Sequence, residues 1–220
     1  MRFLQKTIHV QPRKFADTEK AHNRFAATEQ QILGIINASF LGVVYPLMGG
    51  RRKMGEEKKQ KVYLETSFVS YLTGRATTRE PVASWQAASR QWWEAVRPSC
   101  DLFVSEHVLN EIQKGAPDDV AKRTEIIRNL PVLGGSIPEV SAIAERLIAA
   151  HALPIQEVAD AYHIATAAYY GMDVLLTWNC RHMANEFTLP KTYGVLKEAG
   201  VDSPVIITPK RYMEDANHDE

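Results

Sequence analysis

Cysteine is scarce in this sequence. The chain of 220 residues has only Cys100 and Cys180, which are too few for a disulfide framework and lack the close spacing of zinc ligands. Both are expected to be small residues in or near the core. This cysteine usage is typical of a reducing compartment, so we expect a cytoplasmic protein.

The sequence also lacks net charge. Its 26 Lys and Arg residues equal its 26 Asp and Glu residues, so no overall field attracts the protein to nucleic acid. Binding to a polyanion would therefore require a local basic patch. The balance hides an asymmetry, because residues 1–60 carry eleven basic and five acidic residues.

Long hydrophobic runs are missing as well. The most apolar stretch, residues 32–48, is interrupted by Asn37, Ser39 and Pro46 and is shorter than the roughly 20 residues of a spanning helix. We therefore expect no membrane span. The charged run "GGRRKMGEEKKQK" that follows is typical of a linker. Residues 1–60 are interpreted as an N-terminal extension and linker, with the hypothesis that Met54 is the natural start and residues 1–53 a gene-model artefact.

From Lys61 onward, apolar strand patterns alternate with helix patterns. Such alternation is typical of parallel strands joined by helical crossovers. It predicts an α/β/α sandwich over residues 61–210, with a central, mostly parallel sheet flanked by helices. Residues 211–220 are acidic and are predicted to be disordered. The expected strands are residues 61–65, 101–106, 131–135, 173–179 and 203–209.

Three polar residues fall where the carboxyl edge of this sheet should be. Glu65 ends the first strand, Asn179 ends the fourth, and Glu111 lies in the helix after the second. Sites in open α/β sheets form at this edge. Taken singly, each residue has another interpretation: Glu65 as a helix cap, Glu111 as a solvated helix acid, and Asn179 as a turn residue.

Asp160 lies in the helix pattern "EVADAYHIATAA", which is otherwise small or apolar. A buried carboxylate is costly without a compensating group, and no Lys or Arg occurs between His151 and Trp178. A metal ion is the most economical compensation, although a hydrogen bond to His163 is an alternative. Oxygen donors favour Mg²⁺ or Mn²⁺ over zinc, and acids holding Mg²⁺ commonly position water against a phosphodiester.

Four segments in order resemble the PIN-domain family, and specifically the VapC-like toxins of toxin–antitoxin systems. They are "VYLETSFVSYL", "VSEHVLNEI", "DAYHIATAAYYGMDVLLTWN" and "CRHMAN", which span residues 62 to about 185. The resemblance implies a PIN-like fold and a Mg²⁺-dependent endoribonuclease, with Mn²⁺ as a possible substitute. It also implies an RNA substrate, a cognate antitoxin and a homodimer.

The family's acidic positions map onto residues already noted. Glu65, Glu111 and Asp160 take the first three positions and are the implied metal ligands, and Asn179 takes the fourth. The sequence departs from the family twice, since Glu65 is longer than the usual Asp and Asn179 is neutral. The missing negative charge at Asn179 should weaken the binding of a second metal ion more than the binding of the first. We therefore expect one firm Mg²⁺ site and leave the use of two metals open.

Further residues have supporting or peripheral roles in this hypothesis. Thr177 is expected to hydrogen-bond a ligand carboxylate, and His163 to orient Asp160 or, as an alternative, to bind the metal. Arg181 and His182 are expected to contact RNA phosphates at the rim. Four basic residues could extend the basic patch, although solvated surface is the favoured interpretation for each: Arg75, Arg79, Arg90 and Lys114. Three tryptophans could stack on bases, although core packing or an interface is favoured, with an interface role for Trp93: Trp85, Trp92 and Trp93.

Three functions remain open at this point. The first is an endoribonuclease toxin. The second is a PIN-like module that binds RNA or a partner without cleavage, which Asn179 in place of an acid supports. The third is a metal phosphoesterase acting on small molecules. The cluster of carboxylates favours the first, because an RNA-binding module gains nothing from concentrated negative charge.

Overall fold

The computed structural model describes residues 59–217. The predictions on Met54, on the apolar stretch at 32–48 and on residues 218–220 lie outside the described residues. Within the described part of the chain, no helix is both long and apolar enough to cross a membrane.

Five strands form one sheet in which every pair is parallel. The spatial order is β3-β2-β1-β4-β5. The predicted parallel sheet is thus confirmed, with strand positions close to those expected from the apolar runs. The strands are β1 (Gln60–Leu64), β2 (Cys100–Ser105), β3 (Val132–Leu133), β4 (Val174–Leu176) and β5 (Val205–Ile207).

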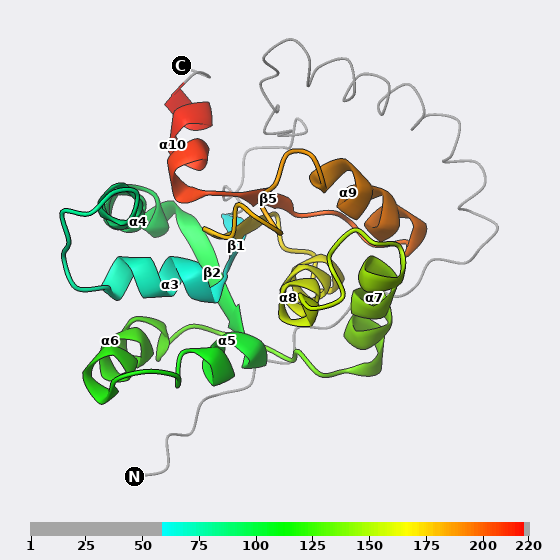
Figure 1. Cartoon of the computed structure of the whole chain (residues 1–220), viewed down its shortest axis with the longest axis horizontal. Coiled ribbons are helices and arrows are strands. Elements are labelled where there is room, and N and C mark those ends of the chain that lie inside the picture. Colours follow the sequence, from blue (N-terminus) through cyan, green and yellow to red (C-terminus); the bar gives the residue numbers. More distant parts are fainter. Residues whose placement is uncertain (1–58, 218–220) are drawn as a thin grey trace.

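Helices cover both faces of this sheet, which confirms the α/β/α sandwich. Figure 1 shows α3, α4 and α6 to one side of the strands and α7, α8 and α9 to the other. The helices are α3 (Thr66–Thr73), α4 (Val82–Ala95), α5 (Glu106–Glu111), α6 (Pro117–Ile127), α7 (Pro138–Ala149), α8 (Val158–Tyr169), α9 (Leu189–Glu198) and α10 (Pro209–Asn217), with a 3-10 turn η1 (Arg97–Ser99) before β2.

The strand order places a topological switch between β1 and β4. The chain adds β2 and β3 on one side of β1, then crosses over to add β4 and β5 on the other side. The connections therefore diverge at the carboxyl ends of β1 and β4, which is where α/β sheets bind ligands. The backbone N–H of Glu65 donates to the carbonyl of Leu176 (3.1 Å), so the ends of the two strands are held together.

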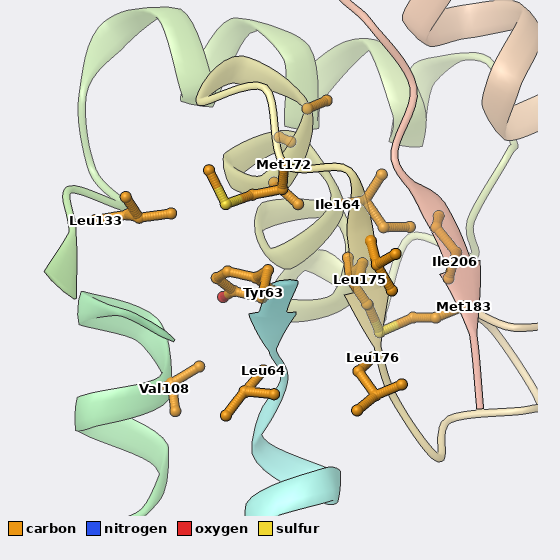
Figure 2. Close-up of a cluster of buried hydrophobic side chains, with 14 of the residues drawn as sticks. Tyr63, Leu64, Val108, Leu133, Ile164, Met172, Leu175, Leu176, Met183 and Ile206 are labelled. Carbon is orange, nitrogen blue, oxygen red and sulfur yellow. The ribbon is translucent and has the colours of Figure 1, made fainter. Parts of the chain in front are cut away.

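The central strands are buried on both faces, as their continuous apolar sequences predict. Figure 2 shows Tyr63 and Leu64 of β1 beside Leu175 and Leu176 of β4, with Ile164 of α8 packed nearby. All five side chains are 0% exposed. The strands are thus fixed in register by side chains on both faces.

The second core layer lies under α3 and α4. Phe68 and Trp92 are both 0% exposed, and their rings meet edge to face with centroids 5.4 Å apart. This confirms core packing as the role of Trp92. Phe68 is two residues past the start of α3, so its packing also fixes the helix that follows Glu65.

The prediction of a disordered tail is wrong for residues 211–217, which belong to α10. The acidic residues of this helix pair with basic residues one turn earlier, as in Arg211 Nε to Asp215 Oδ1 (2.9 Å). Tyr212 anchors the helix, because its hydroxyl donates to Gln60 Oε1 (2.6 Å) and its ring packs edge to face on Trp92. The prediction rested on the acidic composition of the tail and gave no weight to the contacts that Tyr212 makes.

Candidate active site

Glu65 both caps α3 and faces the switch point. It has extended backbone (φ −81°, ψ 159°), and its Oε2 accepts the Ser67 N–H (3.0 Å), the Ser67 hydroxyl and the Thr177 hydroxyl (2.8 Å). Three donors on one oxygen fix the carboxylate, which is only 6% exposed. The cap interpretation is therefore correct, and it does not exclude a second role for the other oxygen.

Glu111, the last residue of α5, reaches the same place. Its Oε2 accepts the Thr66 hydroxyl and His163 Nε2–H (3.1 Å). Burial raises the pKa of Glu111, but the hydrogen bond and charge of His163, with the Thr66 hydroxyl and the Lys114 charge, outweigh it and lower the pKa to about 2. Glu111 is therefore ionised at neutral pH.

His163 is held by a buried relay of hydroxyl groups. Its Nδ1 lies 2.7 Å from the Tyr63 hydroxyl, which lies 2.7 Å from Ser105 Oγ. The hydroxyl groups can rotate, so Nε2–H points at Glu111 whether His163 is neutral or charged. Burial lowers the pKa of His163, while the hydrogen bond to Glu111 and the nearby carboxylates raise it, with a net increase.

The orientation of Asp160 by His163 was expected and is not found. Asp160, in the first turn of α8, points instead toward the segment after β4, while His163 points toward β1 and α5. His163 therefore orients Glu111, because both of its ring nitrogens are already in hydrogen bonds, to Tyr63 and to Glu111.

Replacing Tyr63 by Phe should destabilise the fold. The change leaves His163 Nδ1 buried without its partner, and a lost buried partner costs about 1–3 kcal/mol. Urea unfolding measures the effect. Tyr169→Phe is the control, because the Tyr169 hydroxyl makes no hydrogen bond within the described residues. Equal stability of the two variants would contradict the relay.

Asp160 is held by Asn179. Its Oδ2 accepts Asn179 Nδ2–H (2.7 Å), while Asn179 Oδ1 accepts the backbone N–H of His182 (3.1 Å). The Asn179 backbone N–H donates to Thr177 Oγ1 (3.0 Å), whose hydroxyl donates to Glu65. Thr177 thus makes the hydrogen bond to a carboxylate that was expected of it, and it connects Glu65 to Asn179.

Asp160 carries a negative charge that nearby side chains do not compensate. Burial first, and then the charge of Glu65, raise its pKa from 3.8 to about 6, with Glu157 adding to the shift. The charge of His163 and the hydrogen bond from Asn179 oppose it without cancelling it. A site that disfavours its own ionised carboxylate favours a cation.

The carboxylates share one pattern that fits a divalent metal. Within the described residues, all hydrogen bonds fall on one oxygen of each group, Oε2 of Glu65 and Glu111 and Oδ2 of Asp160. Ligand atoms of Glu65, Glu111 and His163 lie within 4.8 Å of one another; Asp160 is outside this group. With the nitrogens of His163 already hydrogen-bonded, the remaining donors are carboxylate oxygens, which suit Mg²⁺ or Mn²⁺.

The two residues expected to contact RNA phosphates, Arg181 and His182, differ in their surroundings. Arg181 is exposed, whereas His182 Nε2 lies 3.3 Å from Glu157 Oε1 and is tied to an acid. Trp85 stacks on Trp178 with centroids 5.5 Å apart, which is a packing role.

Sequence reasoning missed the hydroxyl groups of the site. Thr66 and Ser67 donate to the carboxylates of Glu111 and Glu65, whereas Tyr63 and Ser105 hold His163. Two signals were available. A tyrosine in a buried strand needs a partner for its hydroxyl, and the Thr and Ser directly after Glu65 lie within reach of the same edge.

The chain matches the model of a known protein family. The family model described as "PIN domain" matches residues 62–182. No curated protein matches the chain. Among solved structures, the chain is similar to a chain in the crystal structure of VapBC2 from Rickettsia felis bound to a DNA fragment from their promoter, with 13% identity and a TM-score of 0.44, over 68% of this chain and 98% of that one. The family match covers more than half of the sequence, from β1 to beyond Asn179. This chain belongs to the PIN domain family.

Proposed function

We propose that this protein is a Mg²⁺-dependent endoribonuclease, able to use Mn²⁺, and that it is the toxin of a type II toxin–antitoxin pair. The observation that carries the proposal is the set of three carboxylates at the switch point, each held through one oxygen. Membership in the PIN domain family supports nuclease chemistry. The resemblance of its four motifs to VapC-like toxins supports the toxin role.

Glu65, Glu111 and Asp160 would hold the metal. When bound, Mg²⁺ supplies positive charge that shields the scissile phosphate and makes a bound water more acidic. Thr177 and Ser67 keep Glu65 in place, and His163 keeps Glu111 deprotonated. A carboxylate of the site would assist in deprotonating the attacking water.

The partners in this proposal follow from the resemblance. A cognate antitoxin would cover the carboxylates, and the toxin would form a homodimer in the cytoplasm. Arg181 and His182, which follow Asn179 at the rim, would contact RNA phosphates. Phosphate contacts of this kind make RNA binding fall with salt.

Cleavage of total RNA by the full-length protein tests the proposal. We expect cleavage in Mg²⁺ or Mn²⁺ that EDTA abolishes. A Glu65→Gln protein purified in parallel should be inactive, which excludes a contaminating nuclease. Metal-independent cleavage, or equal cleavage by Glu65→Gln, would contradict the assignment.

The neutral Asn179 at the fourth position favours one alternative, a module that binds RNA without cutting it. That function is supported if the protein binds RNA but cleaves no RNA of a broad panel, in the presence of Mg²⁺ or of Mn²⁺. Hydrolysis of nitrophenyl phosphate without cleavage of RNA would instead identify a small-molecule phosphoesterase.

A further inference from the structure

A polar cavity lies between α3 and α6, and none of the candidate metal ligands lines it. Its volume is about 260 Å³, and it is lined by Ser70, Thr73, Gly74, Arg75, Asp119 and Arg123. Two arginines and one aspartate are among these lining residues, so the lining carries a net positive charge. Arg75 is largely exposed (78%) and lies 3.8 Å from Asp119, which leaves most of its donors available to a ligand.

One face of α3 leads from the active site to this cavity. Thr66 donates to Glu111, and Ser70 and Thr73 follow four and seven residues later, on the same face of the helix. At the rise of an α-helix, these two residues lie about 6 Å and about 10 Å along the axis from Thr66. The cavity is therefore adjacent to the candidate metal site.

A second connection runs through the segment after α5. The charge of Lys114 is among the causes that lower the pKa of Glu111. Lys114 therefore interacts electrostatically with a carboxylate of the active site. Arg123 Nη2 donates to the Lys114 carbonyl, while Arg123 Nε is buried without a hydrogen-bond partner in the described part of the chain. Basic groups thus extend from Glu111 to the cavity, and one retains an unused donor.

We propose that the α3–α6 cavity binds a backbone phosphate of the RNA, next to the phosphate that is cleaved. The inference rests on the proposed function and names a subsite for its substrate. A phosphate suits paired guanidinium groups and a hydroxyl such as Ser70. An acidic segment of a protein partner offers similar chemistry, and the test separates the two.

Binding of a fluorescent single-stranded RNA to the full-length protein in EDTA tests the subsite directly. We expect Arg75→Gln and Arg123→Gln each to weaken binding by up to about tenfold and to reduce the slope of log K against log salt by about 0.7. Arg128→Gln, on the same side of the molecule near the end of α6, is the control, because Arg128 pairs with Glu125 in solvent. Its binding should remain that of wild type.

One further variant and Arg75→Gln together control for a structural role of Arg123. Arg123→Lys keeps the charge and should retain most of the salt slope. Arg75 is largely exposed, so Arg75→Gln should not unfold the protein. Normal RNA binding by both Gln variants would overturn the proposal, and a loss confined to binding of a protein partner would assign the cavity to that partner.

Cleavage kinetics separate this inference from the proposed function. In an active enzyme, the Gln variants should raise KM and leave kcat near that of wild type. If wild type binds RNA through these arginines but never cleaves it, the nuclease proposal fails and the subsite stands. If wild type cleaves RNA and both variants have the KM of Arg128→Gln, the subsite is wrong.

Discussion

Asp160→Asn should abolish RNA cleavage and, without metal, make the protein more stable. The substitution keeps the shape of the side chain and an oxygen that accepts the Asn179 hydrogen bond. It removes the charge that would hold the metal. Electrostatic stabilisation by a metal is worth several kcal/mol in the transition state, so the rate should fall by about a hundredfold or more.

The gain in stability follows from the raised pKa of Asp160. The unfolded carboxyl group loses its proton near pH 3.8 and the folded one near pH 6. Between these values the folded state binds more protons, so stability falls as pH rises, and the full penalty applies above pH 6. After discounting for its partial exposure, removing the charge should stabilise the metal-free protein by about 1 kcal/mol at pH 7.

Thermal unfolding measures the gain in stability and the weakened binding of metal. In EDTA, Asp160→Asn should raise the Tm by about 2–4 °C, and this gain should disappear near pH 4. Mg²⁺ or Mn²⁺ should then stabilise wild type more than the variant, because only a ligand that binds the folded state raises the Tm. A lower Tm in EDTA, or equal stabilisation of both proteins by metal, would contradict this account of Asp160.

Phe68→Ala should have the largest effect on stability. Phe68 is fully buried and meets Trp92 edge to face, so truncation leaves a cavity under α3. Such substitutions cost about 3–5 kcal/mol. Urea unfolding followed by tryptophan fluorescence measures the loss.

Phe187→Ala is the matched control for this prediction. Phe187 is 95% exposed, so its removal should change the free energy of unfolding by less than about 0.5 kcal/mol. Similar losses for the two variants would show that the layer formed by α3 and α4 is not packed as described.

Much of the fold was predictable because strands buried on both faces have continuous apolar sequences. The runs at β1, β4 and β5 gave strand positions, and the helices between them required parallel crossovers. The strand order was not predictable, since no local pattern specifies that β4 pairs with β1. The helix α10 was missed because its stability comes from contacts with Gln60 and Trp92, which are distant in sequence.

The sequence indicated the edge of the sheet at which Glu65 lies, but it did not indicate the hydrogen bonds that hold the side chains there. Glu65 and Asn179 could be placed because each follows a strand, Glu65 directly after β1 and Asn179 three residues after β4. The partner of His163 could not be, because side-chain direction on α8 depends on tertiary packing. As a result His163 was assigned to Asp160, three residues away, when its partners are Glu111 and Tyr63.

The most direct test of the account is a crystal structure of the full-length protein soaked in Mn²⁺, with anomalous diffraction to locate the ion. We predict one strong peak at the carboxyl ends of β1 and β4. Its ligands should be the oxygens of Glu65, Glu111 and Asp160 that accept no hydrogen bond from the described residues. No peak at saturating Mn²⁺, or a peak held by other residues, would contradict the central claim that these carboxylates form a metal centre.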